Sequence, residues 1–496
     1  MQQASFIARH GLWTDEQKLQ AEALKRRVEK DGLKFIRLAW ADAHGYSRAK
    51  IVTIPAFLSA LADGFNIGVA AHTLDSAGAR VFASFTRGGG MGLDEMTGSP
   101  SLTAVPDPST FRVLPWAPGV GWMLCDEYFN NGTPFHFSPR QLLRKQIKQL
   151  AGKGMGCVVG VEIEWYLLRA AQEHLTEENV AVPGTRGRPI ATWPVEPGYH
   201  YYSESNMDLM QPMFSVLGEA YETLGLPLRS IENEWGPGQV ECTFAPTDAL
   251  QAADNLVLFR TATRQLCRRM GYLASFMCRP KIKGACSSGW HLHQSVVDAD
   301  TGANLLTPQA PDEPLSSAGK AYLGGLLEHA LAATVFANPT VNAYRRFRPN
   351  SLAPDRLTWG TDHRGVMLRV LAARGNPASR IENRLGEPAA NPYLYIASQI
   401  ITGLDGVDNA RDPGPPDTDP YSTDRARLPG SLSDALDLME REPLFRREMG
   451  DLFIDYYVAL KRTEVGRFTQ FVGAHNLDAA SDEITDWEQN EYFDFF

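Results

Sequence analysis

Two carboxylates stand two residues apart in an otherwise apolar segment that reads VEIEWYLL, residues 161–168. Side chains of a β-strand alternate between its two faces, so Glu162 and Glu164 share one face and the apolar residues share the other. Two like charges about 6 to 7 Å apart repel each other. Taken alone, the pair fits a half-exposed strand whose acids point into water, so other segments must decide what it does.

A second group of acids lies in the segment IENEWGPGQVECTF. Pro237 and Gly238 suit the two central positions of a type II turn. If the flanking residues pair as a hairpin, Glu234 stands directly opposite Glu241, with Glu232 two residues away on the same face. Opposed like charges destabilise a sheet, so we expect a cation between them. An exposed hairpin edge is the alternative.

Two imidazoles lie at strand spacing in the segment SSGWHLHQS. Alternation places His291, His293 and Ser295 on one face of a strand. A single histidine is usually structural. Two histidines at this spacing beside a serine, in a chain that also has paired acids, indicate a metal or phosphate site.

Arginines accompany the acids in the last third of the chain. In ASRIENRLGEPAANPY, Arg380, Glu382 and Arg384 share one strand face, so one acid is expected between two cations. A surface ladder of salt bridges is the alternative. Further candidate phosphate partners, in NAYRRFRPNS and WGTDHRGVMLRV, are Arg346, Arg364 and Arg369.

Together these segments supply five carboxylates and one imidazole as candidate metal ligands. They are Glu162, Glu164, Glu234, Glu241, Glu382 and His291. Oxygen-dominated ligation favours Mg²⁺ or Mn²⁺ over zinc or copper, and five carboxylates are more than one ion needs, so at least two ions are expected. Divalent ions beside an arginine cluster indicate phosphoryl transfer from a nucleotide. The chain has no Walker loop and no kinase glycine-rich loop.

The composition fits a globular protein that acts on a small molecule. The chain has 496 residues, 44% of them hydrophobic, which suits two or more domains. The net charge of -10 argues against a nucleic-acid partner. Six cysteines without a C-x-x-C pair argue against a disulfide scaffold and favour the reducing cytoplasm. No apolar run approaches 18 residues, so no membrane partner is expected.

Several elements that must position these residues can be read from periodicity and from capping residues. Residues 14–32 predict an amphipathic helix, and LKFIRLAWAD after it alternates like a strand. Residues 86–100 contain five glycines among polar residues and predict a flexible loop. Residues 411–424 predict a Pro/Asp-rich loop, after which helical patterns run to the last residue.

A second predicted helix marks a domain boundary. It follows Ser138, has Pro139 at its first position and ends at Gly152. We place the boundary just before it, which gives an N-terminal domain of residues 1–135 and a catalytic domain of residues 136–496. The glycines of GKGMG end a helix and precede a strand, which is the reverse of a dinucleotide-binding fingerprint, so a Rossmann domain is rejected.

The chain resembles glutamine synthetase and its γ-glutamyl-amine ligase relatives from about residue 33 to 470. The motifs that carry the resemblance are VEIEWYLL, NEWGPGQVE, GWHLHQS, NPTVNAYRR, WGTDHRGVMLRV and RIENRLGEPAANPYLYIASQIITGLDGV. The resemblance implies an α+β fold with a small N-terminal β-grasp domain and a large catalytic domain, in which helices flank a half-open antiparallel β-barrel. It also implies a double-ring homo-oligomer, such as a dodecamer, with active sites between neighbouring subunits.

The resemblance also implies a role for each candidate residue. The first metal would be bound by Glu164, Glu234 and Glu241, and the second by Glu162, His291 and Glu382. ATP would be bound by His293, Ser295, Arg364, Arg369 and Arg380. Glutamate would be bound by Ser287, Gly289, Arg346 and Arg384. Of these, Arg364 and Arg384 are also expected to take part in catalysis.

Three positions differ in an informative way from true glutamine synthetases. Leu352, in RPNSLAP, stands where the family has a flap glutamate, and Gly68, in IGVAA, stands where it has an aspartate of the ammonium site. Asp42, in WADAHGYSRAK, keeps the other aspartate. A small buried cation needs negative partners, so the loss of two acids disfavours ammonium. The resulting amine site, Asp42 with Gly68 and Leu352, is roomier and more apolar.

We therefore expect an ATP-dependent ligase that joins the γ-carboxylate of glutamate to an alkyl, aromatic or polyamine substrate through γ-glutamyl phosphate. Asp42 is the candidate to orient or deprotonate the amine. An ordinary glutamine synthetase is one alternative, and a non-catalytic structural or sensing relative is another, although the full set of ligands argues against the latter. Tyr421, in DPYSTD, lies roughly where bacterial glutamine synthetases are adenylylated, but the local match is poor and a plain loop tyrosine is expected.

Overall fold

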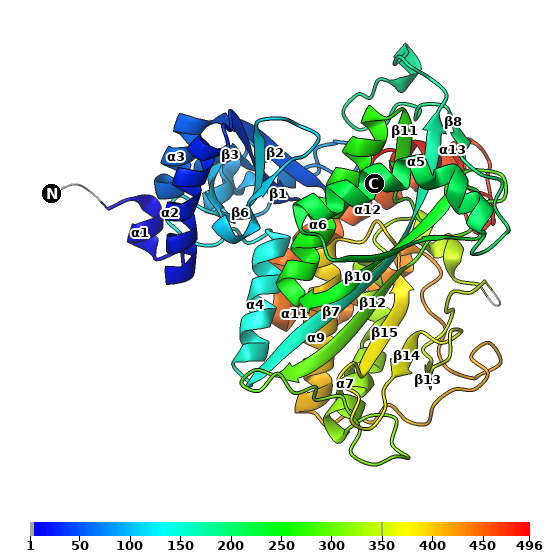
Figure 1. Ribbon diagram of the computed structural model, residues 1–496. Coiled ribbons are helices and arrows are strands. Elements are labelled where there is room, and N and C mark those ends of the chain that lie inside the picture. Colours follow the sequence, from blue (N-terminus) through cyan, green and yellow to red (C-terminus); the bar gives the residue numbers. More distant parts are fainter. Residues whose placement is uncertain (1–3, 349–350) are drawn as a thin grey trace.

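The computed structural model describes residues 4–348 and 351–496 and has a mixed α/β fold built on two sheets (Figure 1). The first sheet has the strand order β2-β1-β6-β4-β3, with β5 on β6, and only β1 and β6 pair in parallel. Its strands are β1 (Phe35–Ala41), β2 (Ser47–Thr53), β3 (Phe65–Gly68), β4 (Ser101–Pro106), β5 (Arg112–Val113) and β6 (Val120–Tyr128). The strand predicted over LKFIRLAWAD is β1.

Three helices accompany this sheet: α1 (Phe6–His10), α2 (Asp15–Lys30) and α3 (Ile54–Asp63). The predicted helix over residues 14–32 is confirmed as α2. Its N-cap Thr14 and Gln17 form a reciprocal capping box, which satisfies two backbone donors at the helix start. The glycine-rich segment 86–100 contains two short 3₁₀ turns, η2 (Arg87–Gly90) and η3 (Asp94–Met96), rather than continuous loop.

The second sheet is larger and curls into a half-barrel (Figure 1). Its order is β13-β14-β15-β12-β7-β10-β9, with β8 and β11 also on β7. Its strands are β7 (Met155–Ala170), β8 (Thr192–Pro194), β9 (Leu228–Asn233), β10 (Gln239–Asp248), β11 (Tyr272–Ser275), β12 (Trp290–Asp298), β13 (Trp359–Thr361), β14 (Leu368–Leu371) and β15 (Arg380–Gly386). All these pairings are antiparallel except β13 with β14.

Helices pack against this sheet and follow it along the chain. They are α4 (Pro139–Ala151), α5 (Glu204–Leu224), α6 (Ala249–Arg269), α7 (Ser317–Glu328), α8 (Ala330–Ala337), α9 (Pro392–Asp408), α10 (Leu432–Arg441), α11 (Pro443–Met449), α12 (Asp451–Ala474) and α13 (Asp486–Tyr492). Helices α4 and α6 contact β7, and α9 packs on both of them. Residues 409–431 contain no helix or strand, as predicted for the Pro/Asp-rich loop.

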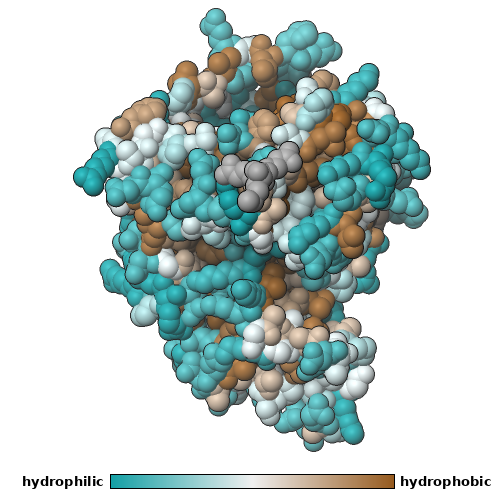
Figure 2. Space-filling view, turned by 90° about the vertical axis from the view of Figure 1, so that its left-hand side faces the viewer, coloured by the Kyte–Doolittle hydropathy of each residue, from teal (hydrophilic) through white to brown (hydrophobic). Residues whose placement is uncertain are grey.

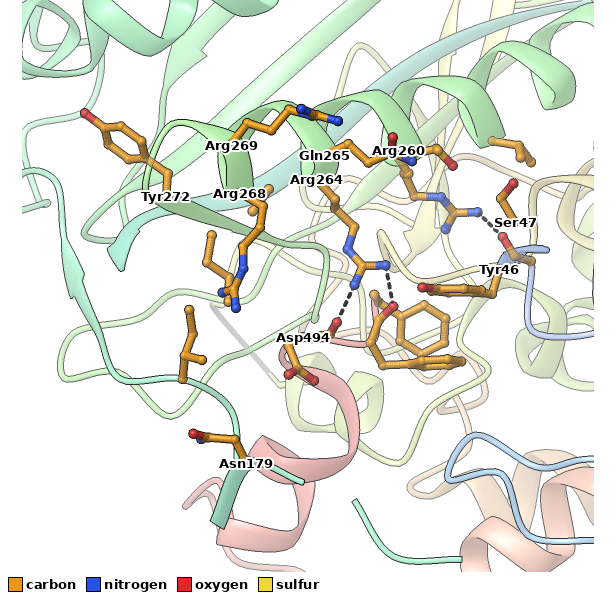
Figure 3. Close-up of a pocket in the computed structure, with 18 of the residues that line it drawn as sticks. Tyr46, Ser47, Asn179, Arg260, Arg264, Gln265, Arg268, Arg269, Tyr272 and Asp494 are labelled. Atoms are coloured by element: carbon orange, nitrogen blue, oxygen red, sulfur yellow. Dashed lines mark hydrogen bonds between the residues drawn. The ribbon is translucent and has the colours of Figure 1, made fainter. Parts of the chain in front are cut away.

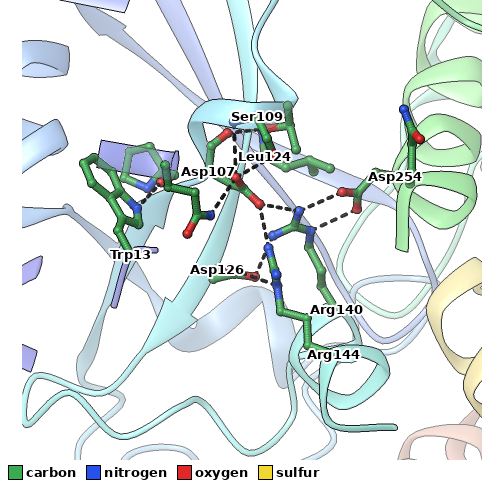
Figure 4. Close-up of polar contacts among 12 residues, drawn as sticks. Trp13, Asp107, Ser109, Leu124, Asp126, Arg140, Arg144 and Asp254 are labelled. Atoms are coloured by element: carbon green, nitrogen blue, oxygen red, sulfur yellow. Dashed lines mark hydrogen bonds and ion pairs between the residues drawn. The ribbon is translucent and has the colours of Figure 1, made fainter. Parts of the chain in front are cut away.

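A buried arginine joins the first sheet to the helices of the second (Figure 4). The Arg140 guanidinium, on α4, donates to Asp107 after β4, to Asp126 on β6 and to Asp254 on α6, each at 2.7 Å. Arg144, one turn later, donates to Asp107 at 2.6 Å. Three carboxylates shared by two guanidiniums fix the position of α4 between the sheets.

The surface is mixed, and all six cysteines are free thiols. On the face in Figure 2, hydrophobic residues form separate groups among hydrophilic ones. Within the described part of the chain, no helix is both long and apolar enough to cross a membrane.

Candidate active site

The pairing of four strands brings the predicted acids and imidazoles to one face of the half-barrel. Strand β7 pairs with β10 on one side, where Glu164 faces Glu241, and with β12 on the other, where Glu162 faces His291. The residues on either side of the two glutamates, including Ile163, are buried on the opposite face. The predicted sharing of one face by Glu162 and Glu164 is therefore confirmed, and the face is not a water-exposed edge.

The predicted pairing of Glu234 with Glu241 is wrong. Glu241 faces Glu232 on β9, and Val240 faces Asn233. The turn itself forms, since Gln239 N donates to Gly236 O at 2.9 Å, but Glu234 N donates to Gln239 O at 3.0 Å. Glu234 therefore pairs with Gln239, residues 235–238 form a four-residue loop, and the register differs from the predicted one by two residues.

Two groups of side chains have ligand atoms close enough to share a metal ion. In the first, ligand atoms of Glu162, Glu241 and His291 all lie within 4.8 Å of one another, and in the second those of Glu162, His293 and Glu382 do so. Glu162 belongs to both groups. Glu164 and Glu234 belong to neither, so this arrangement divides the ligands differently from the two sets that the family resemblance implies.

Electrostatics separate the acids into two kinds. Burial would raise the pKa of Glu162, but His291 Nδ1 at 2.7 Å and His293 Nε2 at 3.2 Å outweigh it and lower that pKa. Burial and then the neighbouring carboxylates raise the pKa of Glu241 to about 11 and that of Glu234 to about 8. Such acids hold protons at neutral pH in place of a cation.

The pKa of Glu164 lies between those of these two kinds of acid. Burial raises its pKa to about 7, although Arg346 opposes the shift. Its Oε2 accepts hydrogen bonds from Gln239 Nε2 at 2.9 Å and from Gly289 N at 3.0 Å. Buried carboxylates with raised pKa values, lying beside two imidazoles, fit hard divalent cations. Such ions would replace the protons on the carboxylates.

Glu382 lies between two arginines, but not the expected pair. Arg384 donates to Glu382 Oε1, and Arg369 on the adjacent strand β14 donates to Oε2 at 3.0 Å. Arg380 instead donates from Nε to His293 Nδ1 at 3.1 Å. The reason is cross-strand register, because Arg369 stands directly opposite Glu382. The alternative of a surface salt-bridge ladder is excluded by the complete burial of Glu382.

The residues predicted to bind glutamate meet beside Glu164. Arg346 is buried and donates to the backbone carbonyls of Leu385, Gly386 and Arg384 at 2.8 to 3.0 Å. A Cβ atom at Gly289 would lie 2.7 Å from Arg346 Nη2, so only glycine fits there. Ser287, two residues earlier, is half-buried.

Two predicted nucleotide-binding residues differ in their exposure and in the contacts that their side chains already make. The Ser295 hydroxyl donates to Ser379 O at 2.8 Å, so it is engaged within the sheet. Arg364 is exposed, in the connection between β13 and β14. Tyr421 is half-buried, and its hydroxyl donates to Ala353 O at 3.3 Å.

The three predicted amine-site residues do not meet within one chain. Gly68 ends β3 in the first sheet, on the left of Figure 1, whereas Leu352 lies in the segment that leads to β13, a strand of the second sheet on the right. Pro349 and Asn350 of the RPNSLAP motif lie outside the described residues. Leu352 has φ +62° and is 65% exposed, an unusual backbone conformation for a leucine.

Asp42 is enclosed in the turn between β1 and β2. Its Oδ1 accepts from the backbone N–H groups of His44 at 2.9 Å and Tyr46 at 3.0 Å, and its Oδ2 accepts from Arg48 Nε at 2.8 Å. Burial would raise the pKa of Asp42, but Arg48 and the other donors outweigh it and lower that pKa. The carboxylate therefore shapes the turn in this chain.

Two features of the site were not found from the sequence. Gln239 Nε2 bridges Glu164 and the Ser288 hydroxyl, both at 2.9 Å, and so fixes one acid. An aromatic stack also forms beside the acids, in which Tyr201 lies 5.0 Å from Trp235 with the rings 2° from parallel. Two signals were available in the sequence. They are the glutamine in the strand GQVE and the repeated aromatic residues in GYHYYS.

Comparisons with known proteins agree on one family. The family model for "Glutamine synthetase, catalytic domain" matches residues 136–480. A "Gamma-glutamylanilide synthase" of Acinetobacter sp is 44% identical over 493 residues, 98% of each chain. A "Glutamate--isopropylamine ligase" of Pseudomonas sp is 31% identical and covers 94% of this chain and 98% of its own. The solved structure "Apo GmaS without ligand" matches with a TM-score of 0.76 at 28% identity, over 94% of this chain and 98% of that one.

Proposed function

Since this chain belongs to the glutamine synthetase family, we propose that it joins the γ-carboxylate of glutamate to an aromatic amine, and more slowly to alkyl amines, with conversion of ATP to ADP and phosphate. It is a γ-glutamyl-amine ligase rather than an ordinary glutamine synthetase. The observation that carries the choice of amine is the 44% identity over the whole chain to a relative named for an anilide product.

The reaction follows from the chemistry of the two substrates. The γ-carboxylate of glutamate attacks the terminal phosphorus of ATP, which gives γ-glutamyl phosphate and releases ADP. The amine nitrogen then attacks the carbonyl carbon, phosphate leaves, and the nitrogen loses a proton. We assign glutamate to Arg346 and Arg384 and the nucleotide phosphates to Arg364 and Arg369, because guanidinium groups can bind carboxylate and phosphate in a bidentate manner.

Divalent ions would be held by the buried acids and imidazoles. We propose two or more Mg²⁺ or Mn²⁺ ions, bound by Glu162, Glu164, Glu234, Glu241, His291 and Glu382. Bound there, they supply neutralisation of the charge that develops on the transferred phosphoryl group. His293 is within reach of the same ions or of ATP, because it belongs to one of the two ligand groups.

The aromatic stack provides a wall suited to an aromatic amine. Trp235 is 38% exposed and Tyr201 40% exposed, although both lie beside the buried acids. A flat ring gains both area and stacking geometry against such a surface. An aromatic amine is also largely uncharged at neutral pH, so it needs no carboxylate partner, which agrees with Leu352 and Gly68 in place of acids.

A second copy of the chain would complete the amine site. Within one chain Gly68 and Leu352 are far apart, so we propose that Asp42 and Gly68 come from the neighbouring subunit of a ring, where residues 1–135 form a β-grasp domain. Asp42 would then act by shaping the β1–β2 turn that faces the amine.

Phosphate release tests the proposal. The purified protein is supplied with ATP, Mg²⁺ and glutamate, and with aniline, isopropylamine, methylamine, putrescine, ethanolamine or ammonium in turn, and each product is identified by mass. Aniline should give the highest kcat/KM. If ammonium exceeds every organic amine, the protein is an ordinary glutamine synthetase and the proposal is wrong.

A substitution tests the aromatic wall. Trp235→Ala should raise the KM for aniline about 10-fold, in keeping with the energy of an aromatic pair, while the KM for ATP stays constant. The matched control is Trp193→Ala, since Trp193 is also exposed but lies on β8. A rise in the KM for ATP would instead place the adenine ring on Trp235.

A further inference from the structure

A second cavity lies away from the acids, where α6 meets the β1–β2 turn and residues 494–496 (Figure 3). Its volume is about 540 Å³. None of the residues assigned above to metal, nucleotide, glutamate or amine lines it. Three of its lining residues, Gly45, Tyr46 and Ser47, lie at the β1–β2 turn that is proposed above to face the amine of a neighbour, whereas its arginines have no role in the proposed reaction.

Arginines dominate the lining of this cavity. Arg260, Arg264 and Arg268 are spaced four residues apart, so they follow one face of α6, and Arg269 and Arg188 join them. The one acid among the lining residues, Asp494, is already paired with Arg186 at 2.9 Å. Arg188 is paired with Glu178 at 3.1 Å, so four guanidinium groups without a carboxylate partner among the described residues remain around this cavity, in a chain of net charge -10.

The inner arginines support the walls of the cavity. Arg260 Nη1 donates to the carbonyls of Pro388 and Ala390 at 3.0 and 3.1 Å, and Arg264 Nη1 donates to Phe495 O at 2.7 Å. Burial, and then the charge of Arg264, lower the pKa of Arg260 to about 10. The guanidinium charges of Arg260 and Arg264 repel each other, and this repulsion lowers the stability of the fold unless an anion offsets it.

The outer arginines are free to bind. The side chains of Arg268 and Arg269 make no hydrogen bond or ion pair to any residue that the structure describes, and Figure 3 shows Arg268 extending from α6 into the space below it. Tyr46 and Phe495 stack at 4.9 Å with rings 5° from parallel and form a flat apolar wall opposite. The cavity thus combines guanidinium donors with a flat apolar wall.

We propose that this cavity binds a small polyanion, a molecule with two or more carboxylate or phosphate groups. Its anionic groups would lie between Arg268 and Arg264, which both extend below α6 in Figure 3, because guanidinium groups make charge-assisted hydrogen bonds with anions. The volume admits a small metabolite and excludes a folded macromolecule.

Calorimetric titration tests the proposal on the full-length protein, freed of metal by EDTA and then dialysed into buffer without it, with citrate and pyrophosphate as the two probes and NaCl-matched ionic strength. At least one probe should bind at one site per chain. Arg268→Ala should weaken that binding about 10-fold or more, because a charged hydrogen bond is lost, and Arg268→Lys should retain most of it. Binding of citrate alone identifies a carboxylate ligand, and binding of pyrophosphate alone a phosphate ligand.

Two matched variants separate this cavity from other anion sites. Arg26→Ala removes an equally exposed arginine from α2 and should leave binding unchanged. Arg364→Ala alters the proposed nucleotide site and should also leave it unchanged. The proposal is overturned if neither probe binds, if Arg26→Ala weakens binding as much as Arg268→Ala, or if binding depends on Arg364. It is likewise overturned if Arg268→Ala changes the mass of the assembly but not the binding of either probe, since the cavity then holds a second copy.

Discussion

The chemistry of single residues is clearest at Glu241, a buried acid with carboxylates on both sides. It faces Glu164 on β7 and Glu232 on β9, and it shares a ligand group with His291. Such a cluster costs stability without cations, so it is retained for a function. The geometry therefore makes Glu241 the most informative position to change.

Replacing Glu241 by glutamine should abolish turnover. Glu241→Gln keeps the size of the side chain but removes the charge that a divalent ion needs, so kcat/KM should fall about 100-fold or more. Phosphate release at saturating Mg²⁺ measures it. Glu219→Gln, at an exposed position on α5, is the control and should keep full activity. Unchanged turnover in Glu241→Gln contradicts the metal site.

The raised pKa values predict that metal binding releases protons. Without metal, the pKa of Glu234 is about 8 and that of Glu241 about 11, so both carboxyls are protonated at pH 7. A divalent ion must displace these protons, and its affinity should therefore rise with pH between about 6 and 9. Calorimetry of Mn²⁺ binding in two buffers of different ionisation enthalpy measures the release. Binding without proton release would mean that the acids are already ionised.

At the scale of elements, the sequence predicts which residues form strands better than how the strands pair. Alternation identified β7, β12 and β15 and the faces of their polar residues. It could not identify the four-residue loop 235–238, because a Pro-Gly turn signal does not fix the residue at which the flanking strands begin to pair. Nor could it place Arg369 beside Glu382, because alternation along one strand does not fix which residue of a neighbouring strand lies opposite. The sharing of Glu162 between two ligand groups likewise depends on the pairing of four strands, β7, β10, β12 and β15.

The junction between the two sheets depends on Arg140. Removing it leaves Asp107, Asp126 and Asp254 buried without their main partner, so Arg140→Met should lower the free energy of unfolding by about 3 to 5 kcal/mol. Urea denaturation followed by fluorescence measures it. Arg144→Met is the comparison and should cost less, because Arg144 is one-third exposed. Equal stability of Arg140→Met and the native protein contradicts this role.

The same junction should make stability depend on pH in the acid range. Burial would raise the pKa of Asp107, but the guanidiniums of Arg140 and Arg144 outweigh it and lower that pKa. The unfolded value is about 4. A lowered folded pKa gives stability that is present above about pH 4 and is lost as the pH falls toward the folded pKa. Arg140→Met should therefore flatten the fall in melting temperature below pH 4.

At the scale of the whole molecule, the proposed amine site requires two subunits. Gly68 has no atom within 4 Å of the place its Cβ would occupy, so Gly68→Trp should fold normally yet obstruct the site of a neighbour. Glu241→Gln instead disables the metal-binding part of the site, which comes from the other subunit. When the two inactive variants are refolded together in equal amounts, about a quarter of the sites should be intact and activity should return to that level. Two variants that stay inactive together, or an active Gly68→Trp, contradict a shared site.

The most direct test of the central claim is one competition assay that follows both the amine and the phosphate. Glutamate labelled with ¹⁸O in its γ-carboxylate is incubated with the protein, ATP, Mg²⁺ and equal concentrations of aniline and ammonium, and the products are analysed by mass. The account predicts γ-glutamylanilide as the main product and one ¹⁸O atom in the released phosphate, because the oxygen passes from the carboxylate through γ-glutamyl phosphate. Unlabelled phosphate would contradict the mechanism, and glutamine as the main product would contradict the choice of amine.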